Sequence, residues 1–524
     1  MARTAAARKY GKSTRNTRAE QLFAELPKSP IKKMAEEKEE KTITAEEKIA
    51  STPSSTCSSP SQTSTTSTRE STPPDIEEEG QLPNPDSPGK ESPPEAEDSY
   101  LSTTSEDLRI LTWTDILPPT TQINKIAEAS YAEVYRLTNP LGTSIIKVVR
   151  LQSPIKPQTK AQQKSGLVDE EPHSPESMQN ELLISESLAD IPGFVIYKER
   201  YVVRGKAPKS LLETHQIFHR KEKRKDPDRL QFYPSPSRYL DDTEFLVVEL
   251  GDAGTALEDF SLESISQVWD IFLHTAIALA RAEDLIQFEH RDLHEGNLCI
   301  RQVRSPSACS SPESTATKFG NSGLEITILD YGLSRASFSS LASRQHHSIY
   351  YDLEKDLSLF TSTHAEQCKI YRQMRSYLIR GDRINALPAS KHTIPYQDSI
   401  SWRGHFPYTN VLWLHYVYSY LVKNFTGDAK ELRQFKKETK ELRVHLDPEA
   451  PRGVLSFPCA GDVVRFVVEA GWVEEGQLIG DGGDGSTFLS CGGGWDEGVS
   501  IVGRRDIGEE KETEGPRRSP RKSG

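Results

Sequence analysis

Residues 287–300 read QFEHRDLHEGNLCI, and about thirty residues further on residues 328–332 read ILDYG. Asp292 and Asn297 lie five positions apart in the first stretch, and the apolar residues LCI that follow predict a short strand. In the second stretch, Asp330 ends another predicted strand, LEITILD. Each acidic residue alone would be interpreted as a solvated loop charge, but two such motifs in this order are specific enough to decide the fold.

Together these motifs carry groups that phosphoryl transfer requires. The reaction needs an aligned γ-phosphate, a metal ion that bridges its oxygens and a carboxylate beside the incoming hydroxyl group. We expect Asp292 to accept or orient the proton of that hydroxyl. Asn297 and Asp330 are the predicted ligands of Mg²⁺, which would bind together with ATP.

Lys147 is a candidate for contacting the nucleotide phosphates. It lies in SIIKVV (144–149), a predicted strand in which a buried ammonium group needs a partner. Glu181, on a helix predicted at 179–191, can supply that partner. In kinases such an ion pair aims the lysine at the α- and β-phosphates. Without the downstream motifs, a lysine that snorkels from a strand edge would be the better interpretation.

The loop expected to cover the nucleotide, in KIAEASYAEVY (125–135), has alanines where kinases usually place glycines. Alanine is the next smallest residue, so the backbone donors can still approach phosphate, over a narrower range of backbone angles. The link between the lobes, residues 249–253, is expected to bind adenine through its backbone. The predicted nucleotide contacts are Ala127, Glu128, Ala129, Ala132, Val134, Lys147, Glu249, Gly251, Asp252, Asn297 and Asp330.

The pattern of apolar residues predicts an α+β fold with two lobes. A small antiparallel-sheet lobe with one helix is expected over about 107–250, and a larger helical lobe over about 251–472. Residues 1–106 are rich in Ser, Thr and Pro and are predicted to be disordered. A Ser/Pro-rich insertion is expected at about 303–323, between the strands LCI and LEITILD. Residues 473–524 form a Gly-rich and charged tail.

Composition limits the partners and the compartment. The chain has 65 basic and 77 acidic residues and a net charge of −12, which argues against general nucleic-acid binding and suits a basic peptide partner. We also expect no direct sequence-specific binding of nucleic acid. Its six cysteines form no CxxC pair, which indicates a reducing compartment without disulfides or structural zinc. We expect neither a secretory signal nor a membrane span, because the most apolar run, 411–422, is too short and reads as a buried helix.

Residues 107–472 resemble the haspin family of atypical serine/threonine protein kinases, in its fungal form. The segments that carry the resemblance are FEHRDLHEGN (288–297), DYGLSR (330–335), DLEKDLSLF (352–360), KIYRQMR (369–375) and PYTNVLWLHY (407–416). An alanine-containing nucleotide loop is also similar to the fungal haspins, and the chain shares with the family the lack of an Ala-Pro-Glu motif.

The resemblance implies a specific activity: phosphorylation of a threonine in the N-terminal tail of histone H3, within ARTKQT, during mitosis. It implies a monomer located in the nucleus and on mitotic chromosomes. By position, His294 takes the place of the usual catalytic-loop lysine, while Glu128 and Asp356 are expected to bind basic side chains of the substrate. Ser358 stands where the family has a further carboxylate, and Asp352 and Glu354 are the candidates to compensate for it.

Two other functions remain open on the sequence alone. A small-molecule phosphotransferase of the aminoglycoside or choline kinase type shares the D-L-H-x-G-N pattern, although Arg291 favours a protein kinase. A pseudokinase that acts as a chromatin scaffold would explain the alanine-containing loop.

Two further hypotheses concern short basic segments. The N-terminal sequence ARTAAARK resembles a histone H3 tail, so Thr4 is a hypothetical autophosphorylation or pseudosubstrate site. The basic clusters at 219–225 and 517–522 are hypothetical import signals.

Overall fold

The computed structural model describes residues 108–129, 131–164, 167–305, 317–339, 346–363, 365–383, 386–396, 400–478 and 499–502. Three parts of the chain lie outside these residues: residues 1–106, which we predict to be disordered, the centre of the insertion at 303–323, and most of the C-terminal tail. The hypotheses about Thr4 and the basic cluster at 517–522 lie outside them as well.

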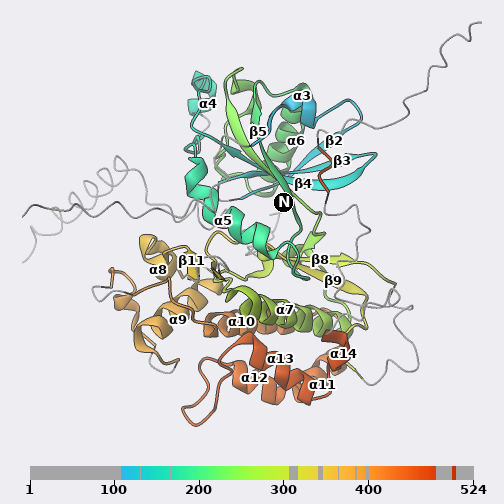
Figure 1. Ribbon diagram of the computed structural model, residues 1–524, viewed down its shortest axis with the longest axis vertical. Helices are drawn as coiled ribbons and strands as arrows, with labels where there is room; N and C mark the ends of the chain where they lie inside the picture. The colour runs from blue at the N-terminus through green and yellow to red at the C-terminus, as the bar shows by residue number, and fades with distance from the viewer. Residues whose placement is uncertain are drawn as a thin grey trace, which may run out of the picture. The chain divides into compact units, whose positions relative to one another are not determined.

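The N-terminal lobe is built on a six-stranded sheet with the order β1-β5-β6-β4-β3-β2 (Figure 1). Neighbouring strands are antiparallel except β1 and β5, which are parallel. The strands are β1 Ile110–Thr112, β2 Gln122–Glu128, β3 Glu133–Asn139, β4 Gly142–Arg150, β5 Tyr197–Arg204 and β6 Glu244–Leu250. The predicted sheet lobe is therefore confirmed, and the stretch 125–137 contains the end of β2 and the beginning of β3.

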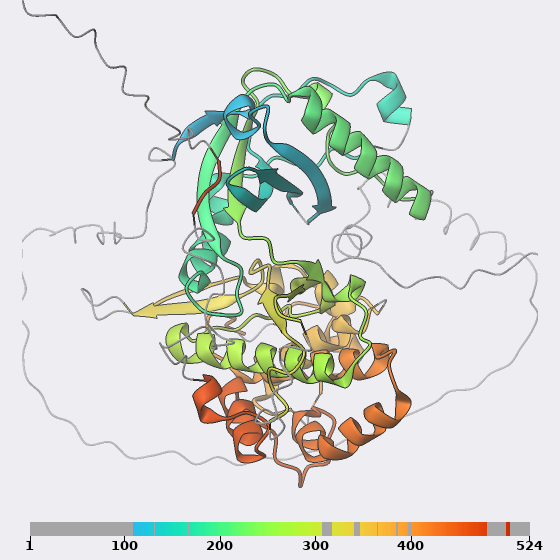
Figure 2. The same ribbon diagram turned by 90° about the vertical axis from the view of Figure 1, so that its right-hand side faces the viewer.

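Two long helices belong to this lobe, whereas the pattern of apolar residues predicts one. The helices are α3 Trp113–Ile116, α4 Lys160–Lys164, α5 Pro175–Leu188 and α6 Lys209–Lys225. The predicted helix corresponds to α5, and α6, which lies against β2, was missed (Figure 2). Leu211, His215 and Phe218 are buried at helical spacing on α6, but its end, HRKEKRK, is so highly charged that the sequence indicates only a basic cluster there.

The C-terminal lobe is mainly helical, as predicted. Its helices are α7 Ile265–Ile286, α8 Ser358–Thr361, α9 Gln367–Arg380, α10 Tyr408–Asn424, α11 Ala429–Glu438, α12 Lys440–Leu446, α13 Ala460–Glu469 and α14 Glu475–Leu478. Its strands are β7 Thr255–Ala256, β8 Leu298–Gln302 and β9 Leu324–Ile328, which form one sheet, and the hairpin β10 Arg335–Ser339 with β11 His346–Tyr350. Short 3-10 turns occur at Pro236–Arg238, Leu257–Asp259, Glu295–Asn297, Leu353–Lys355 and Ala389–Lys391.

Helix α7 forms the centre of the lobe and leads into the catalytic motif. It begins after Ser264, which forms a capping box with Gln267, and it ends at Gln287, whose φ of 48° is left-handed. Most of its side chains are buried, and it packs against α10 and α13. Because the helix ends at Gln287, the motif that follows starts at a well-defined point on the lobe core.

Residues 499–502 of the C-terminal tail return to the sheet lobe. Ile501 and Val502 are buried in the core that the sheet forms with Trp113. Glu249, at the end of β6, accepts hydrogen bonds from Ser500 Oγ at 2.6 Å and from the Ile501 backbone N–H at 2.9 Å. This part of the tail is therefore an integral part of the lobe, although its glycine content gave no indication of a docked segment.

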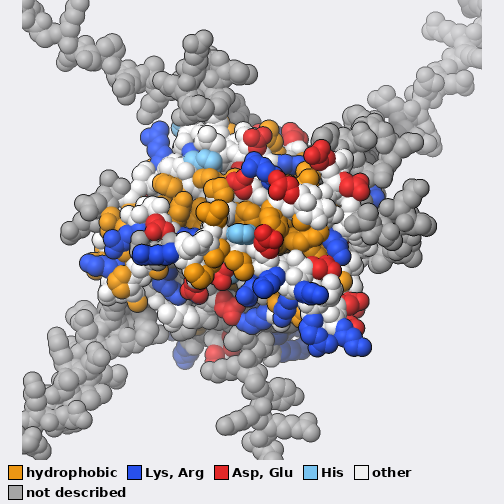
Figure 3. Space-filling view, turned by 90° about the horizontal axis from the view of Figure 1, so that it is seen from below, with side chains coloured by type: hydrophobic (Ala, Val, Ile, Leu, Met, Phe, Trp, Pro, Cys, Tyr) orange, Lys and Arg blue, Asp and Glu red, His pale blue; other side chains and the backbone are white. Residues whose placement is uncertain are grey.

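The underside of the helical lobe carries a band of hydrophobic side chains with charged side chains of both signs around it (Figure 3). Within the described parts of the chain, no helix has the length and apolar character that crossing a membrane requires. The apolar run 411–422 lies inside α10, most of whose side chains are buried, as predicted.

Candidate active site

A cavity of about 480 Å³ lies between the two lobes. Its walls combine apolar side chains, such as Val134, Val248 and Leu250, with charged ones, so it suits a ligand with a flat apolar part and a charged part. The predicted site residues that line it are Ala127, Glu128, Ala129, Val134, Lys147, Glu181, Gly251, Asp252, His294, Asn297 and Asp330. Ala132, Glu249, Asp292 and Asp356 do not line it.

Lys147 and Glu181 form the expected ion pair. Successive side chains of β4 point to opposite faces, so Ile146 and Val148 enter the sheet core while Lys147 faces the cavity. Its Nζ atom lies 3.0 Å from Glu181 Oε1 on α5, and the two side chains are only 19 and 12% exposed. The helix therefore holds the ammonium group at the cavity wall, and the alternative of a lysine at a strand edge is excluded.

The small sheet of the C-terminal lobe brings the two downstream motifs together. Strands β8 and β9 are antiparallel, with Leu298 opposite Ile328. Asn297 comes directly before β8 and Asp330 follows β9, so both residues lie at the same end of the strand pair. A hydrogen bond of 2.9 Å from the Leu329 N–H to the Asn297 carbonyl joins the two loops.

Asp292 lies behind this pair and is fully buried. Its backbone carbonyl accepts a hydrogen bond of 2.8 Å from Asn297 Nδ2, and a carboxylate oxygen accepts a hydrogen bond from the hydroxyl group of Tyr371 on α9. Tyr371 is a site residue that the sequence alone does not indicate. The segment KIYRQMR was noticed only as a family feature, and no local pattern shows that its tyrosine reaches a residue 79 positions earlier.

The donor groups at the cavity fit a magnesium ion. The Asn297 Nδ2 group points at Asp292, which leaves the amide oxygen on the other side, and Asp330 supplies a carboxylate. Mg²⁺ prefers oxygen ligands and is usually held by one or two protein groups together with phosphates and water.

Backbone strain is concentrated beside these groups. Asp330 and Arg291 both have φ of 63°, in the left-handed region that non-glycine residues rarely occupy. Arg291 is buried, with its guanidinium 3.1 Å from Glu289 and 5.2 Å from the centre of the Trp402 ring. Such strain persists only where the surrounding structure enforces it, which is typical of functional loops.

Tyr331, the variant residue of the second motif, uses its hydroxyl group inside the protein. The hydroxyl donates to the Ile328 carbonyl at 2.9 Å and accepts from the Val195 N–H at 3.3 Å. Burial raises the pKa of this phenol far above its ordinary value, so it stays protonated. A phenylalanine could not make this bridge, which holds the Asp330 loop against the segment after α5.

The inter-lobe link differs from the expectation at Gly251, whereas the direction of the Glu249 side chain does not affect the adenine contact expected from the Glu249 backbone. The Gly251 N–H donates to the Ile196 carbonyl at 2.8 Å, so it is not available to adenine, and a Cβ at Gly251 would lie 3.2 Å from Ile196. The Glu249 side chain points to the other face of the sheet, toward the tail segment. The prediction that Ala132 contacts the nucleotide is contradicted, because Ala132 is fully buried in the core.

The family model described as "Haspin like kinase domain" matches residues 91–456. The chain belongs to the haspin family. It is therefore a protein kinase that uses ATP, and the small-molecule phosphotransferase alternative is set aside.

Curated haspins from distant organisms are similar to this chain. The serine/threonine-protein kinase haspin homolog hrk1 of Schizosaccharomyces pombe is 29% identical over 399 residues, which cover 71% of each chain. Haspin of Mus musculus is 26% identical over 345 residues, 65% of this chain and 40% of the mouse protein. The haspin homolog of Drosophila melanogaster is 26% identical over 338 residues, 61% of this chain and 52% of the fly protein. The chain thus spans only about half the length of the two animal relatives.

In this haspin-family kinase, the acidic residues expected to bind substrate have other partners. The Glu128 side chain is 2% exposed and is paired with Lys125 and Arg229, so its expected contact with a substrate side chain is corrected. Glu354 binds Arg375 through both carboxylate oxygens, at 2.7 and 2.8 Å. Asp356 is half-buried and accepts hydrogen bonds from the backbone and the hydroxyl group of Ser358.

His294 lies at the cavity wall, as its predicted role requires. Its Nδ1 atom accepts a hydrogen bond of 3.0 Å from the Gly296 N–H, which fixes the turn between Asp292 and Asn297. A Cβ at Gly296 would lie only 2.9 Å from the imidazole, so this position favours glycine. The histidine therefore shapes the catalytic loop in addition to facing the cavity.

Proposed function

We propose that this kinase transfers the γ-phosphate of MgATP to a threonine in the N-terminal tail of histone H3 during mitosis. The observation that carries the proposal is the convergence of Lys147, Glu181, Asn297 and Asp330 on one cavity in a haspin-family chain, with Asp292 directly behind Asn297. The pseudokinase alternative rested on the alanine-containing loop alone, and these residues argue against it.

Each residue has a distinct part in the proposed reaction. Lys147, aligned by Glu181, would bind the α- and β-phosphates, and Asn297 and Asp330 would hold Mg²⁺. The ion would neutralise charge that develops on the phosphoryl oxygens. Asp292 would orient the threonine hydroxyl and accept its proton. Most of the rate enhancement would come from positioning and charge stabilisation.

A basic peptide suits the acidic groups that line the cavity. Asp252, Glu258 and Asp259 line the cavity, and Asp352 and Asp356 lie on the lobe that would hold the peptide. Carboxylates so placed would steer a peptide rich in Arg and Lys toward the site and would weaken its binding at high salt. We further propose that the protein acts as a monomer on chromatin in the nucleus, without reading DNA sequence.

The test is phosphorylation of the peptide ARTKQTAR by the full-length protein. We expect incorporation of phosphate on the first threonine, little incorporation when that threonine is replaced by alanine, and loss of nearly all activity in Asp292→Asn. Equal labelling of the two peptides would reject the proposed acceptor residue. Activity of Asp292→Asn close to that of the wild type would reject the proposed role of Asp292.

A further inference from the structure

The two strands that carry the nucleotide loop place two carboxylates directly opposite each other. Glu128, the last residue of β2, is the register partner of Glu133, the first residue of β3. Like charges at such positions are destabilising unless a cation compensates them. Lys125 supplies it: its Nζ atom lies 2.7 Å from Glu128 and also forms an ion pair with Glu133, and its side chain is fully buried.

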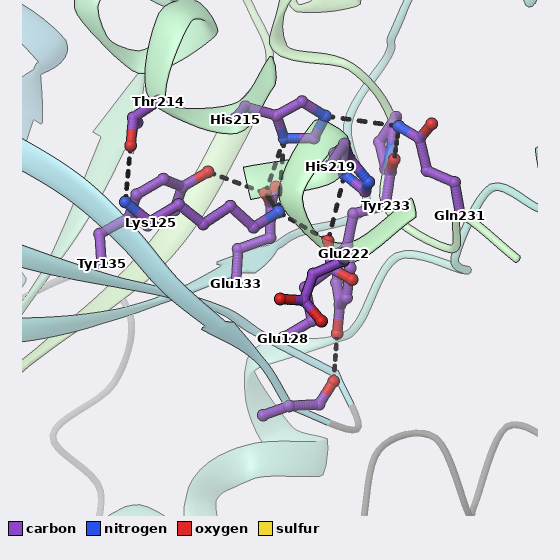
Figure 4. A network of polar contacts seen from close by, with 12 residues as sticks. Lys125, Glu128, Glu133, Tyr135, Thr214, His215, His219, Glu222, Gln231 and Tyr233 are labelled. Atoms are coloured by element: carbon purple, nitrogen blue, oxygen red, sulfur yellow. Dashed lines mark hydrogen bonds and ion pairs between the residues drawn. The ribbon is translucent and has the colours of Figure 1, made fainter. Parts of the chain in front are cut away.

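Helix α6 attaches these carboxylates to the rest of the lobe (Figure 4). His215 Nδ1 lies 3.2 Å from Glu133, and His219 Nε2 lies 3.3 Å from Glu128. Arg229, just after the helix, adds an ion pair of 3.1 Å to Glu128. The strand pair is therefore connected to α6 through both carboxylates.

The same region also holds the loop backbone. Tyr233 Oη donates a hydrogen bond of 2.6 Å to the carbonyl of Ala129, and the Ala129 N–H donates to the Ala132 carbonyl at 2.8 Å. Ala127, Glu128 and Ala129 line the cavity. Tyr233, which does not line the nucleotide cavity, thus holds the segment that covers it.

This arrangement explains how the loop can work without glycines. A glycine-rich loop is flexible and must become ordered when phosphate binds, and alanine restricts the backbone before any ligand arrives. A restricted loop is useful only if it is held in the binding position. The ion pairs at Glu128 and the Tyr233 hydrogen bond supply that constraint, and removing one partner of a buried ion pair is strongly destabilising.

We propose that Glu128 and Tyr233 are positioning residues for the nucleotide, which hold the loop over the cavity before ATP binds. The inference rests on ATP binding in this cavity and is independent of the identity of the protein substrate. ATP would therefore meet a roof that is already in place and would lose little affinity to loop ordering.

The main test compares Tyr233→Phe and Glu128→Gln with Lys209→Ala in the full-length protein. Lys209 lies on the same helix but forms only an exposed ion pair with Glu213. For Tyr233→Phe we expect the dissociation constant and the KM of ATP to rise about fivefold, as for the loss of one hydrogen bond. The kcat and the peptide KM should stay close to the wild-type values, and Glu128→Gln should show a larger rise.

Hydrogen exchange of the amides in residues 126–134 provides a readout that a general loss of stability would not reproduce. In the wild type and in Lys209→Ala, protection of these amides should change little when MgATP is added. In Tyr233→Phe the nucleotide-free protein should exchange faster here, while protection in α7 and α10 stays unchanged.

Two results would overturn the inference. One is an unchanged ATP affinity in both loop variants, and the other is a wild-type loop that becomes protected only when MgATP binds. Failure to phosphorylate the histone peptide would refute the proposed substrate instead, because the ATP titration and the exchange measurement need no protein substrate.

Discussion

The hydroxyl group of Tyr371 donates a hydrogen bond to a carboxylate oxygen of Asp292. Tyr371 is buried on α9, and its ring packs edge-on against Trp413 at a centroid distance of 5.6 Å. The hydrogen bond therefore holds one oxygen of the Asp292 carboxylate against a rigid helix. Because the carboxylate is planar, this also sets the direction of its other oxygen.

We predict that Tyr371→Phe lowers kcat by about tenfold or more, as expected when a hydrogen bond to a charged group is lost. The KM of ATP should change little, since Tyr371 is not among the residues that line the cavity. Steady-state kinetics with a peptide substrate provides the measurement. Tyr377→Phe, on the same helix, is the control and should retain wild-type kcat. A Tyr371→Phe enzyme with unchanged or higher kcat would contradict the prediction.

The ion pair between Lys147 and Glu181 gives a second prediction. Glu181→Gln removes the charge that holds the lysine at the phosphates, so kcat/KM for ATP should fall by about ten- to a hundredfold. Glu186→Gln is a matched control, because Glu186 lies on the same helix, is 56% exposed and is 3.9 Å from Arg200. If the two variants had equal kcat/KM, the alignment role of Glu181 would have to be abandoned.

The predicted residues that the structure brings together are those whose chemistry repeats in a local pattern. Asp292, Asn297 and Asp330 lie in short motifs next to strands, and the antiparallel pairing of β8 with β9 brings Asn297 and Asp330 together. Lys147 was identifiable because a lysine between apolar strand residues requires a partner, and Glu181 was the carboxylate on the following helix.

The residues that could not be predicted depend on contacts between distant segments. Glu128 follows the alternation of a strand, but only the fold shows that Lys125 and Arg229 occupy its carboxylate. The partners of the Glu249 side chain could not be predicted either, because Ser500 and Ile501 lie about 250 positions away in the tail. Helix α6 was missed since its buried face is narrow and its other faces are highly charged.

The buried Glu128 predicts a dependence of stability on pH. Burial alone would raise the pKa of the Glu128 carboxyl, but the charges of Lys125 and His219 lower it from 4.5 to about 2. The ionised, paired form thus stabilises the folded state fully above pH 4.5, and this contribution is lost as the pH falls toward 2.

Between pH 5.5 and 3.5 the wild type should lose about 1 kcal/mol more unfolding free energy than Glu128→Gln, which cannot titrate at this position. Urea denaturation at a series of pH values measures the difference. Glu213→Gln, at an exposed position on α6, should follow the wild type. Parallel curves for the wild type and Glu128→Gln would show that the pairing does not stabilise the ionised carboxylate.

The docked tail segment leads to a prediction about truncation. Residues 499–502 bury Ile501 and Val502 in the sheet lobe and supply the Ser500 and Ile501 hydrogen bonds to Glu249, which is fully buried. Ending the chain at residue 478 removes this cover and leaves a buried carboxylate with fewer donors. The unfolding free energy should fall by about 2–4 kcal/mol from lost apolar burial and hydrogen bonds. As a control, ending the chain at residue 502 keeps the segment and should leave the unfolding free energy near the wild-type value. Equal melting temperatures for the two truncations would show that the segment does not stabilise the lobe.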